Sequence, residues 1–423
     1  MNETIEAIKN NNMIFISAQP DLPYFHWQVS LYLYQFSKHN IQKNCYAIFG
    51  YVSTPSQYIL QLSNNYNIKY YRDDRVEKNY IPSIRPHLLK KFFDQHKNLD
   101  KNVFYHDSDI FLVNLPKFEL MLNDNFGYLS DTVSYIGYNY IKDKSDEYVA
   151  KYSISKDELI NKMCEIVEID PDIVKNNNMN SGGAQYLLKN VSAKFWGEVE
   201  IKCEKLYSYL TEFDSKYKLD NPIQKWCADM WVVLWVYWKY NNNTRIHPEL
   251  NFSWATGTIE DYNNNNIFHL AGVTEKESST MFYKGKYTDS LVFDDYIDNK
   301  DLFDYIDTNN ATKAYADVIK EYVDHTYDRN YIVKQRGKYK TKSIIIQIFG
   351  ENYYFIKNET ITCCDKCIYV STSNKYIIFY NSKVWILTHK QFMDEINKDS
   401  GGIAHTNNIH TDEWNDSNIL TIS

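Results

Sequence analysis

Two carboxylates that interrupt an apolar segment have the clearest potential for chemistry in this sequence. Asp107 and Asp109 stand two residues apart within 103–112 (VFYHDSDIFL). In an extended backbone they would project to the same side. Two hard oxygen ligands after a buried strand suit Mg²⁺ or Mn²⁺, which keep open positions for phosphates. The alternative is a solvated turn at a strand end, but the apolar flanks favour a metal site, because unpaired carboxylates are costly beside a core.

Two later polar residues stand in apolar surroundings. Asp229 is the one carboxylate of an apolar helix predicted over 224–235, where a buried charge needs a partner or a function; the alternative is an interaction with the helix dipole. His269 lies in a predicted strand at 267–273. It is either a satisfied core residue or a third metal ligand, and imidazole suits Mn²⁺ better than Mg²⁺.

Two glycine-containing segments are candidates for contact with a ligand. Gly182 and Gly183 precede an apolar strand, so they either allow close approach of the backbone to a ligand or form a plain tight turn. Lys284 and Lys286 flank a glycine in an aromatic segment. That segment suits phosphates, although it is also ordinary for a surface loop.

Strands that alternate with helices would position these groups. The pattern predicts strands at 13–18, 45–50 and 68–71, and helices at 25–36 and 84–92. Such alternation indicates a mostly parallel sheet wrapped by helices. Because ligands of such sheets bind beyond the carboxyl ends of the strands, we expect 19–21, 72–74 and 107–109 at one edge.

The chain changes character after residue 290. Residues 291–340 are charged, tyrosine-rich and helical in spacing, and 341–423 contain short strands separated by turns, typical of a small all-β module. The predicted organisation is therefore a domain at 1–290, a helical connection at 291–340 and a β module at 341–423. Within the module, Cys363, Cys364 and Cys367 with His405 or His410 are a weak zinc candidate, because the spacing is not a pair of C-x-x-C motifs.

The composition excludes several classes of protein. The 423 residues are 44% hydrophobic and carry a net charge of −8, and nucleic-acid binding usually leaves a basic footprint. No signal peptide is evident at the start, and the longest apolar run, 230–238, is too short to span a membrane. Seven cysteines, an odd number, suit a reducing compartment, so we expect a cytoplasmic protein. Runs of asparagine resemble coding bias in an AT-rich genome, as in some giant viruses or protists.

The ordered series of motifs resembles a known family. Arg-Pro at 85–86, Tyr-His-Asp-Ser-Asp at 105–109, Asn-Ser-Gly-Gly-Ala-Gln at 180–185, the helix with Asp229 and His-x-x-Gly at 269–272 resemble a GT-A glycosyltransferase of the glycogenin type. Residues 24–28 (YFHWQ) are similar to the hydroxyproline arabinosyltransferase and peptidyl-serine galactosyltransferase group. The resemblance covers about 10–290 and implies an α/β fold, a Rossmann-like mixed sheet flanked by helices. The C-terminal β module matches no family that we can place.

The resemblance also implies roles for individual residues. Asp107, Asp109 and His269 would hold Mn²⁺ (or Mg²⁺), with Asp107 also at the nucleotide ribose, and Arg85 would lie near the diphosphate. The family lysine comes three residues after the glycine; Glu275 stands there, followed by Lys276, and we prefer Lys284 for the diphosphate. The remaining donor-binding candidates are Ser108, Asn180, Gly182 and Gly183, together with Gln19 and Asp73, which are chosen by their expected place at the edge of the sheet.

The implied reaction moves a hexose from a UDP-sugar to a hydroxyl of a protein or glycan. Asp229 would orient that hydroxyl or take its proton, and Gln185, which also resembles a donor-sugar contact, is the second catalytic candidate. Partners would be the donor and acceptor, with no nucleic acid, no membrane span and self-association as a homodimer. Alternatives are a silent carbohydrate-binding or structural scaffold and a metal-dependent nucleotidyltransferase or hydrolase acting on phosphates.

Overall fold

The computed structural model describes residues 2–326 and, beyond them, seven short strands within 343–422. Contacts divide the chain into two compact units, one of Met1–Asp289 with Phe303–Val318 and one of Ser290–Leu302 with Ile319–Ser423. The first unit holds every residue of the candidate site except those in the C-terminal cysteine cluster. The predicted domain boundaries at 290 and 340 stay predictions.

A seven-stranded mixed sheet forms the centre of the first unit, in the order β3-β2-β1-β4-β7-β6-β8. Its strands are β1 (Ile14–Pro20), β2 (Cys45–Tyr51), β3 (Ile68–Arg72), β4 (Asn102–His106), β6 (Gly127–Asp131), β7 (Gly182–Lys189) and β8 (Thr244–Ile246). The first four pair in parallel, whereas β7 runs antiparallel to both β4 and β6. The carboxyl ends of β1 to β4 therefore share one edge, as predicted, and the mixed α/β fold is confirmed.

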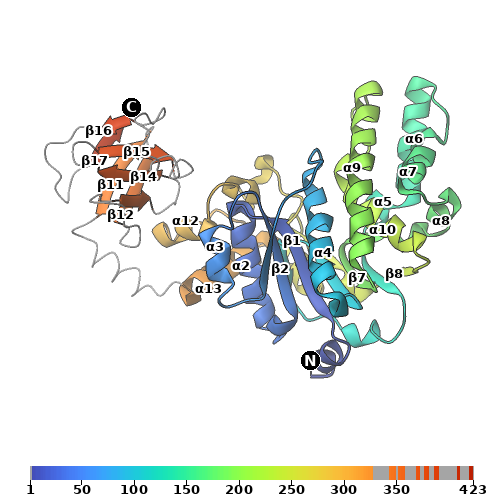
Figure 1. Ribbon diagram of the computed structural model, residues 1–423, viewed down its shortest axis with the longest axis horizontal. Coiled ribbons are helices and arrows are strands. Elements are labelled where there is room, and N and C mark those ends of the chain that lie inside the picture. The colour runs from blue at the N-terminus through green and yellow to red at the C-terminus, as the bar shows by residue number, and fades with distance from the viewer. Residues whose placement is uncertain are drawn as a thin grey trace. The chain divides into compact units, whose positions relative to one another are not determined.

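Alternating side chains bury both faces of this sheet. On β1, Ile14 and Ile16 belong to the core that the sheet forms with α4, α9 and α10, whereas the Phe15 ring contacts Phe36 of α2 and Phe104 of β4. This is the pattern of a strand that is covered by helices on both sides. Figure 1 shows β1 and β2 between α2 and α4.

The helices of the first unit fall between the strands. They are α1 (Asn2–Asn10), α2 (Pro23–Ser37), α3 (Gln57–Leu62), α4 (Ile84–Gln95), α5 (Val133–Ile136), α6 (Tyr138–Tyr152), α7 (Glu158–Val167), α8 (Pro171–Asn176), α9 (Ala193–Lys216), α10 (Ala228–Lys239) and α11 (Ile259–Asn264). The predicted helices at 25–36, 84–92 and 224–235 correspond to α2, α4 and α10. Four helices fill 133–176, a largely polar stretch in which the sequence analysis assigned no element.

The strand predicted across 103–112 is interrupted. β4 ends at His106, and after a turn at 107–109 the chain enters β5 (Ile110–Leu112), which belongs to a separate sheet of order β5-β10-β9. β5 pairs antiparallel with β10 (Ile267–His269), which pairs parallel with β9 (Phe252–Trp254). The backbone is therefore not extended through the two aspartates, and the apolar run is broken at the carboxylates, as its sequence indicated. The turn instead carries the chain from one sheet to the next, and the register of β5 with β10 places Ile110 opposite His269.

The second unit contains α12 (Val292–Asp298) and a seven-stranded sheet; α13 (Ala311–Thr326) passes from the first unit into the second. The sheet has the order β16-β15-β14-β13-β12-β11-β17. Its strands are β11 (Ser343–Ile348), β12 (Glu351–Lys357), β13 (Ile368–Ser371), β14 (Tyr376–Tyr380), β15 (Trp385–His389), β16 (Asn407–Ile409) and β17 (Ile419–Ile422). β11 to β16 pair antiparallel, each with the next along the chain. The predicted all-β character of this region is confirmed for the strands that the structure describes.

Gly182 fills a place where a side chain has no room. A Cβ at this position would meet the backbone oxygen of Ser130, with Leu129 Cβ at 2.5 Å. We expect Gly182→Ala to lower the free energy of unfolding by about 1–3 kcal/mol, because overpacking forces the backbone to shift. Gly197 lies within α9, where an added Cβ would meet only the Lys90 side chain, at 3.3 Å or more. Gly197→Ala is thus the matched control and should stabilise by roughly 0.5–1 kcal/mol. Urea unfolding of both variants checks this, and equal effects would contradict it.

Candidate metal and donor site

Three ligand-type side chains from two segments meet at the carboxyl edge of the main sheet. Asp107 and Asp109 come from the turn after β4, and His269 ends β10. The His269 Nε2 atom lies 3.3 Å from Asp109 Oδ1 and 3.6 Å from Asp107 Oδ2. One ligand atom from each residue falls within 4.8 Å of the others. A hydrogen bond from the Leu270 N–H to the Asp109 carbonyl, 2.9 Å long, ties the two segments together.

This donor set fits a divalent cation. In an octahedral site, two neighbouring ligand atoms each lie about 2.1 Å from the ion with a right angle between them at the ion, so they are roughly 3.0 Å apart. The three side chains therefore need only small rotations to bind one ion. Carboxylate oxygens suit Mg²⁺ and Mn²⁺, and the imidazole nitrogen favours Mn²⁺ of the two. Within the described residues, this trio is the group of His, Cys, Asp and Glu side chains spaced for a metal ion.

Two cations flank the trio. The Arg85 Nη1 atom lies 2.8 Å from Asp107 Oδ1, and the Lys284 ammonium donates to Asp109 Oδ2. Burial alone would raise the pKa of Asp109, but the Lys284 ammonium and then the His269 imidazole hold it well below its usual range. The pKa values of Arg85 and Lys284 are raised, against the effect of burial, by Asp107 and Asp109 respectively. Asp109 is thus ionised, and both cations are charged.

Gln185 lies behind His269 and can set its tautomer. The Ser130 hydroxyl is 2.7 Å from both Gln185 Oε1 and the Leu250 carbonyl, yet a hydroxyl has one proton to donate. If the Gln185 amide is turned over, Ser130 donates to Leu250 and accepts from the amide N–H. The Gln185 oxygen then faces His269 Nδ1, 3.4 Å away. Nδ1 would carry the proton, leaving Nε2 unprotonated toward the two carboxylates, as a metal ligand requires.

Substitutions of Gln185 test this arrangement. We expect Gln185→Leu to weaken Mn²⁺ binding by about 10–100-fold, as is typical when the group that orients a ligating histidine is lost. Gln185→Glu keeps a hydrogen-bond acceptor at this position and should lose much less Mn²⁺ affinity. Gln35, a buried glutamine that donates to the Leu112 carbonyl, supplies the control variant Gln35→Leu. Calorimetric Mn²⁺ titration distinguishes them, and equal affinities for wild type and Gln185→Leu would rule the arrangement out.

Asp229 joins the site through Arg85. Its Oδ2 lies 3.4 Å from Arg85 Nη1, and its Oδ1 lies 2.6 Å from the Tyr80 hydroxyl. The same hydroxyl lies 2.6 Å from the Trp226 carbonyl. Because Tyr80 has one proton for two acceptors, a proton on Asp229 would satisfy both contacts. Burial raises the pKa of Asp229, although Arg85 and Tyr80 oppose the shift.

A cavity of about 260 Å³ contains these groups. Its walls include all of the trio and both cations, together with Ser108, which donates to Gln28 Oε1 (3.0 Å). The lining residues that the sequence analysis did not propose as site residues are Tyr24, Phe25, Gln28, Tyr135, Ala184, Trp226, Met230, Trp254 and Ala271. A second cavity of about 180 Å³ shares Arg85 and Asp107 and reaches Asp229.

Other candidates lie outside these cavities, among the residues that the structure describes. Gln19 is buried and donates to the Ile48 carbonyl. Asp73 forms an ion pair with Arg75 at 2.9 Å, which lowers the pKa of Asp73 to about 2 although burial opposes the shift. Gln185 is fully buried and contacts His269, so its place suits a positioning residue better than a catalytic one.

The segment 180–185 contributes less directly than expected. The Asn180 carbonyl accepts from Thr244, and Gly182 packs on Ser130. Gly183 lies against the Tyr186 hydroxyl and Met230. Of this segment, Ala184 lines both cavities, so these glycines let the backbone pack closely beneath the site.

Two further expectations concern other parts of the chain. The zinc candidate Cys363, Cys364 and Cys367, with His405 or His410, lies outside the described residues. Among the helices that the structure describes, none combines the length and apolarity needed to cross a bilayer.

No protein-family model and no curated protein matches the chain. Among solved structures it is similar to the apo WbbM bifunctional glycosyltransferase, with 13% identity and a TM-score of 0.35, over 68% of this chain and 49% of that chain. The galactosyltransferase LgtC, in complex with donor and acceptor sugar analogs, gives 12% identity and a TM-score of 0.33, over 65% of this chain and 94% of that chain.

A glycosyltransferase involved in glycosylation of the major capsid of PBCV-1 gives 9% identity and a TM-score of 0.31, over 62% of this chain and 96% of that chain. The chain therefore spans about half the length of WbbM and nearly all of the other two. With TM-scores below 0.5, these likenesses carry no weight for the activity, which rests on the site itself.

Proposed function

We propose that this protein is a metal-dependent glycosyltransferase that moves a hexose from a nucleotide-diphosphate sugar, a UDP-sugar, to an acceptor hydroxyl. The observation that carries the proposal is the convergence of Asp107, Asp109 and His269 between the two partly buried cations Arg85 and Lys284 in one cavity. Three ligands alone would suit many metal sites. The added pair of cations matches a substrate that carries a diphosphate.

The charges of the site explain why cation and donor would bind together. In the structure, Arg85 and Lys284 neutralise Asp107 and Asp109. When bound, a divalent ion would act as a Lewis acid and charge clamp on the diphosphate. With the carboxylates engaged as ligands, Arg85 and Lys284 can turn their N–H groups to phosphate oxygens. Arg85 can do so through a planar fork and Lys284 as a point charge.

The reaction breaks the bond between the anomeric carbon and the diphosphate oxygen, which keeps the electron pair. Arg85 and Lys284 stabilise the negative charge that develops on that oxygen, in a cavity with little water to compete. The acceptor oxygen forms the new bond to the anomeric carbon and loses its proton. Asp229, held by Tyr80 and next to Arg85, is the group that we assign to take this proton once it is ionised.

The remaining parts of the proposal rest on other features of the sequence: the imidazole ligand, the odd cysteine count and the tyrosine-rich composition. Mn²⁺ is preferred to Mg²⁺ because of His269. The acceptor is a protein or a glycan, and the protein acts in the cytoplasm and associates as a homodimer.

A donor screen tests the proposal. Purified protein is incubated with a panel of UDP- and GDP-sugars, with Mn²⁺ or with EDTA, and the released nucleotide is measured. We expect one UDP-sugar to be cleaved with Mn²⁺ and not with EDTA. If no donor is cleaved and no nucleotide binds with Mn²⁺, the proposal is wrong and a silent scaffold is favoured. Release of inorganic phosphate without sugar transfer would instead favour a phosphate hydrolase.

A further inference from the structure

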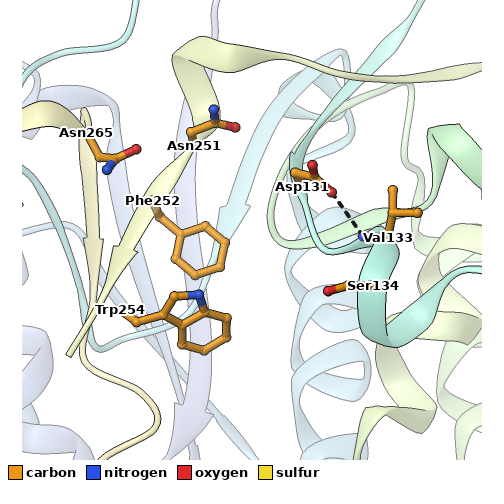
Figure 2. Close-up of a pocket in the computed structure, with 7 residues that line it drawn as sticks. All are labelled: Asp131, Val133, Ser134, Asn251, Phe252, Trp254 and Asn265. Carbon is orange, nitrogen blue, oxygen red and sulfur yellow. Dashed lines mark hydrogen bonds between the residues drawn. The ribbon is translucent and has the colours of Figure 1, made fainter. Parts of the chain in front are cut away.

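A cavity of about 500 Å³ opens beside the metal and donor site. One wall is β9 and the residues just before it, with Asn265 nearby; the facing wall is the end of β6 and the start of α5 (Figure 2). Trp254 lines this cavity and also the cavity of the metal trio. Its ring stacks on His269 at 6.0 Å between centroids and 12° between planes. The two cavities therefore share Trp254 as a lining residue.

The β9 wall is aromatic. Phe252 and Trp254 project from the same side of the strand, with their ring centroids 4.9 Å apart (Figure 2). Trp254 is 38% exposed, so part of its indole remains open to a ligand. Exposed aromatic faces of this kind pack against the C–H faces of sugar rings, which are apolar on the face and polar at the rim.

Polar side chains surround the aromatic pair. Asn251 and Asn265 lie above the rings, and Asp131 and Ser134 face them from the opposite wall (Figure 2). Asp131 Oδ1 accepts from the Val133 N–H at 3.1 Å, which fixes the orientation of the carboxylate. Amide, hydroxyl and carboxylate groups together offer both donors and acceptors. A ligand with many hydroxyl groups can satisfy such a set.

The charge of the cavity narrows the class of ligand. Among its described lining residues, Asp131 is ionisable and no lysine or arginine is present. The cations of the region, Arg85 and Lys284, line the neighbouring cavity instead. A phosphate, a nucleotide or an acidic sugar would meet a carboxylate that no lysine or arginine of the lining offsets, and a lipid chain would cover four polar side chains without offering them a hydrogen bond. A volume of about 500 Å³ suits a small ligand.

We infer that this cavity binds a neutral sugar residue of the acceptor, so that the acceptor is a glycan rather than a bare protein hydroxyl. That the bound sugar belongs to an acceptor rests on the proposed function. That the cavity binds a sugar rests on the cavity alone. Trp254 would support the glycan on one side and His269 on the other. Asn251 and Asp131 would bind ring hydroxyls from facing walls.

Binding of the full-length protein to an array of immobilised oligosaccharides tests this inference. The array holds neutral and sulfated oligosaccharides of two to six residues, and binding is measured in EDTA and without donor. We expect binding to neutral members only. Trp254→Ala should lower that binding at least tenfold. Asn251→Ala should lower it about fivefold, the loss of one hydrogen bond. Tyr70→Ala, which removes an exposed aromatic side chain from β3, is the control and should bind as wild type.

The same variants separate this inference from the proposed function. With a cleavable donor, Asn251→Ala should raise the KM for the bound glycan and leave nucleotide release to water unchanged. Glycan binding without donor cleavage would uphold the cavity and overturn the transferase. Donor cleavage without glycan binding would uphold the transferase and overturn the sugar-binding cavity. Preference for sulfated members, or wild-type binding by both Trp254→Ala and Asn251→Ala, would overturn the inference.

Discussion

Asp109→Asn is expected to lower the Mn²⁺-dependent rate of donor cleavage by about 10³-fold, because several kcal/mol of charge stabilisation depend on the bound ion. Asp109 is 5% exposed, faces His269 and accepts from Lys284. The amide keeps the shape of the side chain but loses the charge, so both the ion and the Lys284 ammonium lose their counter-charge. Steady-state nucleotide release over a range of Mn²⁺ concentrations measures the loss.

A matched control separates this effect from the loss of any ion pair. Asp146 pairs with Lys142 at 2.6 Å on an exposed face of α6, and surface pairs of this kind contribute about 0–1 kcal/mol. Asp146→Asn should therefore keep wild-type activity. Asp109→Asn also leaves the partly buried Lys284 without its partner, so the thermal unfolding of this variant is compared with that of Asp109→Asn/Lys284→Met. Full activity in a folded Asp109→Asn would contradict the proposed site.

Asp229→Asn is expected to slow transfer by about 10²–10⁴-fold, the usual contribution of a general base. Burial raises the pKa of Asp229, so at acidic pH the carboxyl is protonated and cannot take the proton of the acceptor. The wild-type rate should therefore rise with pH through this pKa. Asp229→Asn should lose that rise, since the amide does not titrate. The pH profile of kcat with a saturating donor and acceptor checks both statements.

Tyr80→Phe supplies the comparison for this prediction. The phenol holds Asp229 Oδ1 at 2.6 Å, and its removal should displace the profile along the pH axis rather than abolish the rise. Mn²⁺ affinity should stay the same in Asp229→Asn, because the wild-type Asp229 carboxylate contacts Arg85 and Tyr80 rather than the three metal ligands. An unchanged pH profile in Asp229→Asn would assign the proton to another group.

Much of the first unit could be predicted because its patterns are local. Runs such as Ile14–Pro20 and Cys45–Tyr51 are apolar on both faces, so they read as buried parallel strands. The grouping of Asp107, Asp109 and His269 followed from motif order. The membership of β5 in a second sheet could not be predicted in this way, because the pairing of Ile110–Leu112 with β10 depends on a segment more than 150 residues later in the chain.

The surroundings of the site were harder to predict for the same reason. Trp254, Trp226 and Tyr135 line the cavity, yet nothing in the residues beside them in the sequence marks them as part of a site. Among the helices over 133–176, α6 is rich in Lys and Asp and has a narrow apolar stripe, whereas α7 buries Leu159, Ile160, Met163, Cys164 and Val167 at a regular helical spacing that was overlooked. Asp73 was chosen by its place at the sheet edge, where the structure pairs it with Arg75. Position along the sheet predicts the edge, but the local ion pair decides what a side chain does there.

The most direct test of the central claim is pulsed EPR of the protein with one equivalent of Mn²⁺. The account predicts coupling of the electron spin to a directly coordinated imidazole nitrogen, lost in His269→Ala, together with a binding site lost in Asp107→Ala. His39, a buried histidine that bonds the Leu112 carbonyl, supplies the control His39→Gln, which should keep the coupling. Mn²⁺ bound without nitrogen coupling, or coupling that survives His269→Ala, would contradict a metal centre built from Asp107, Asp109 and His269.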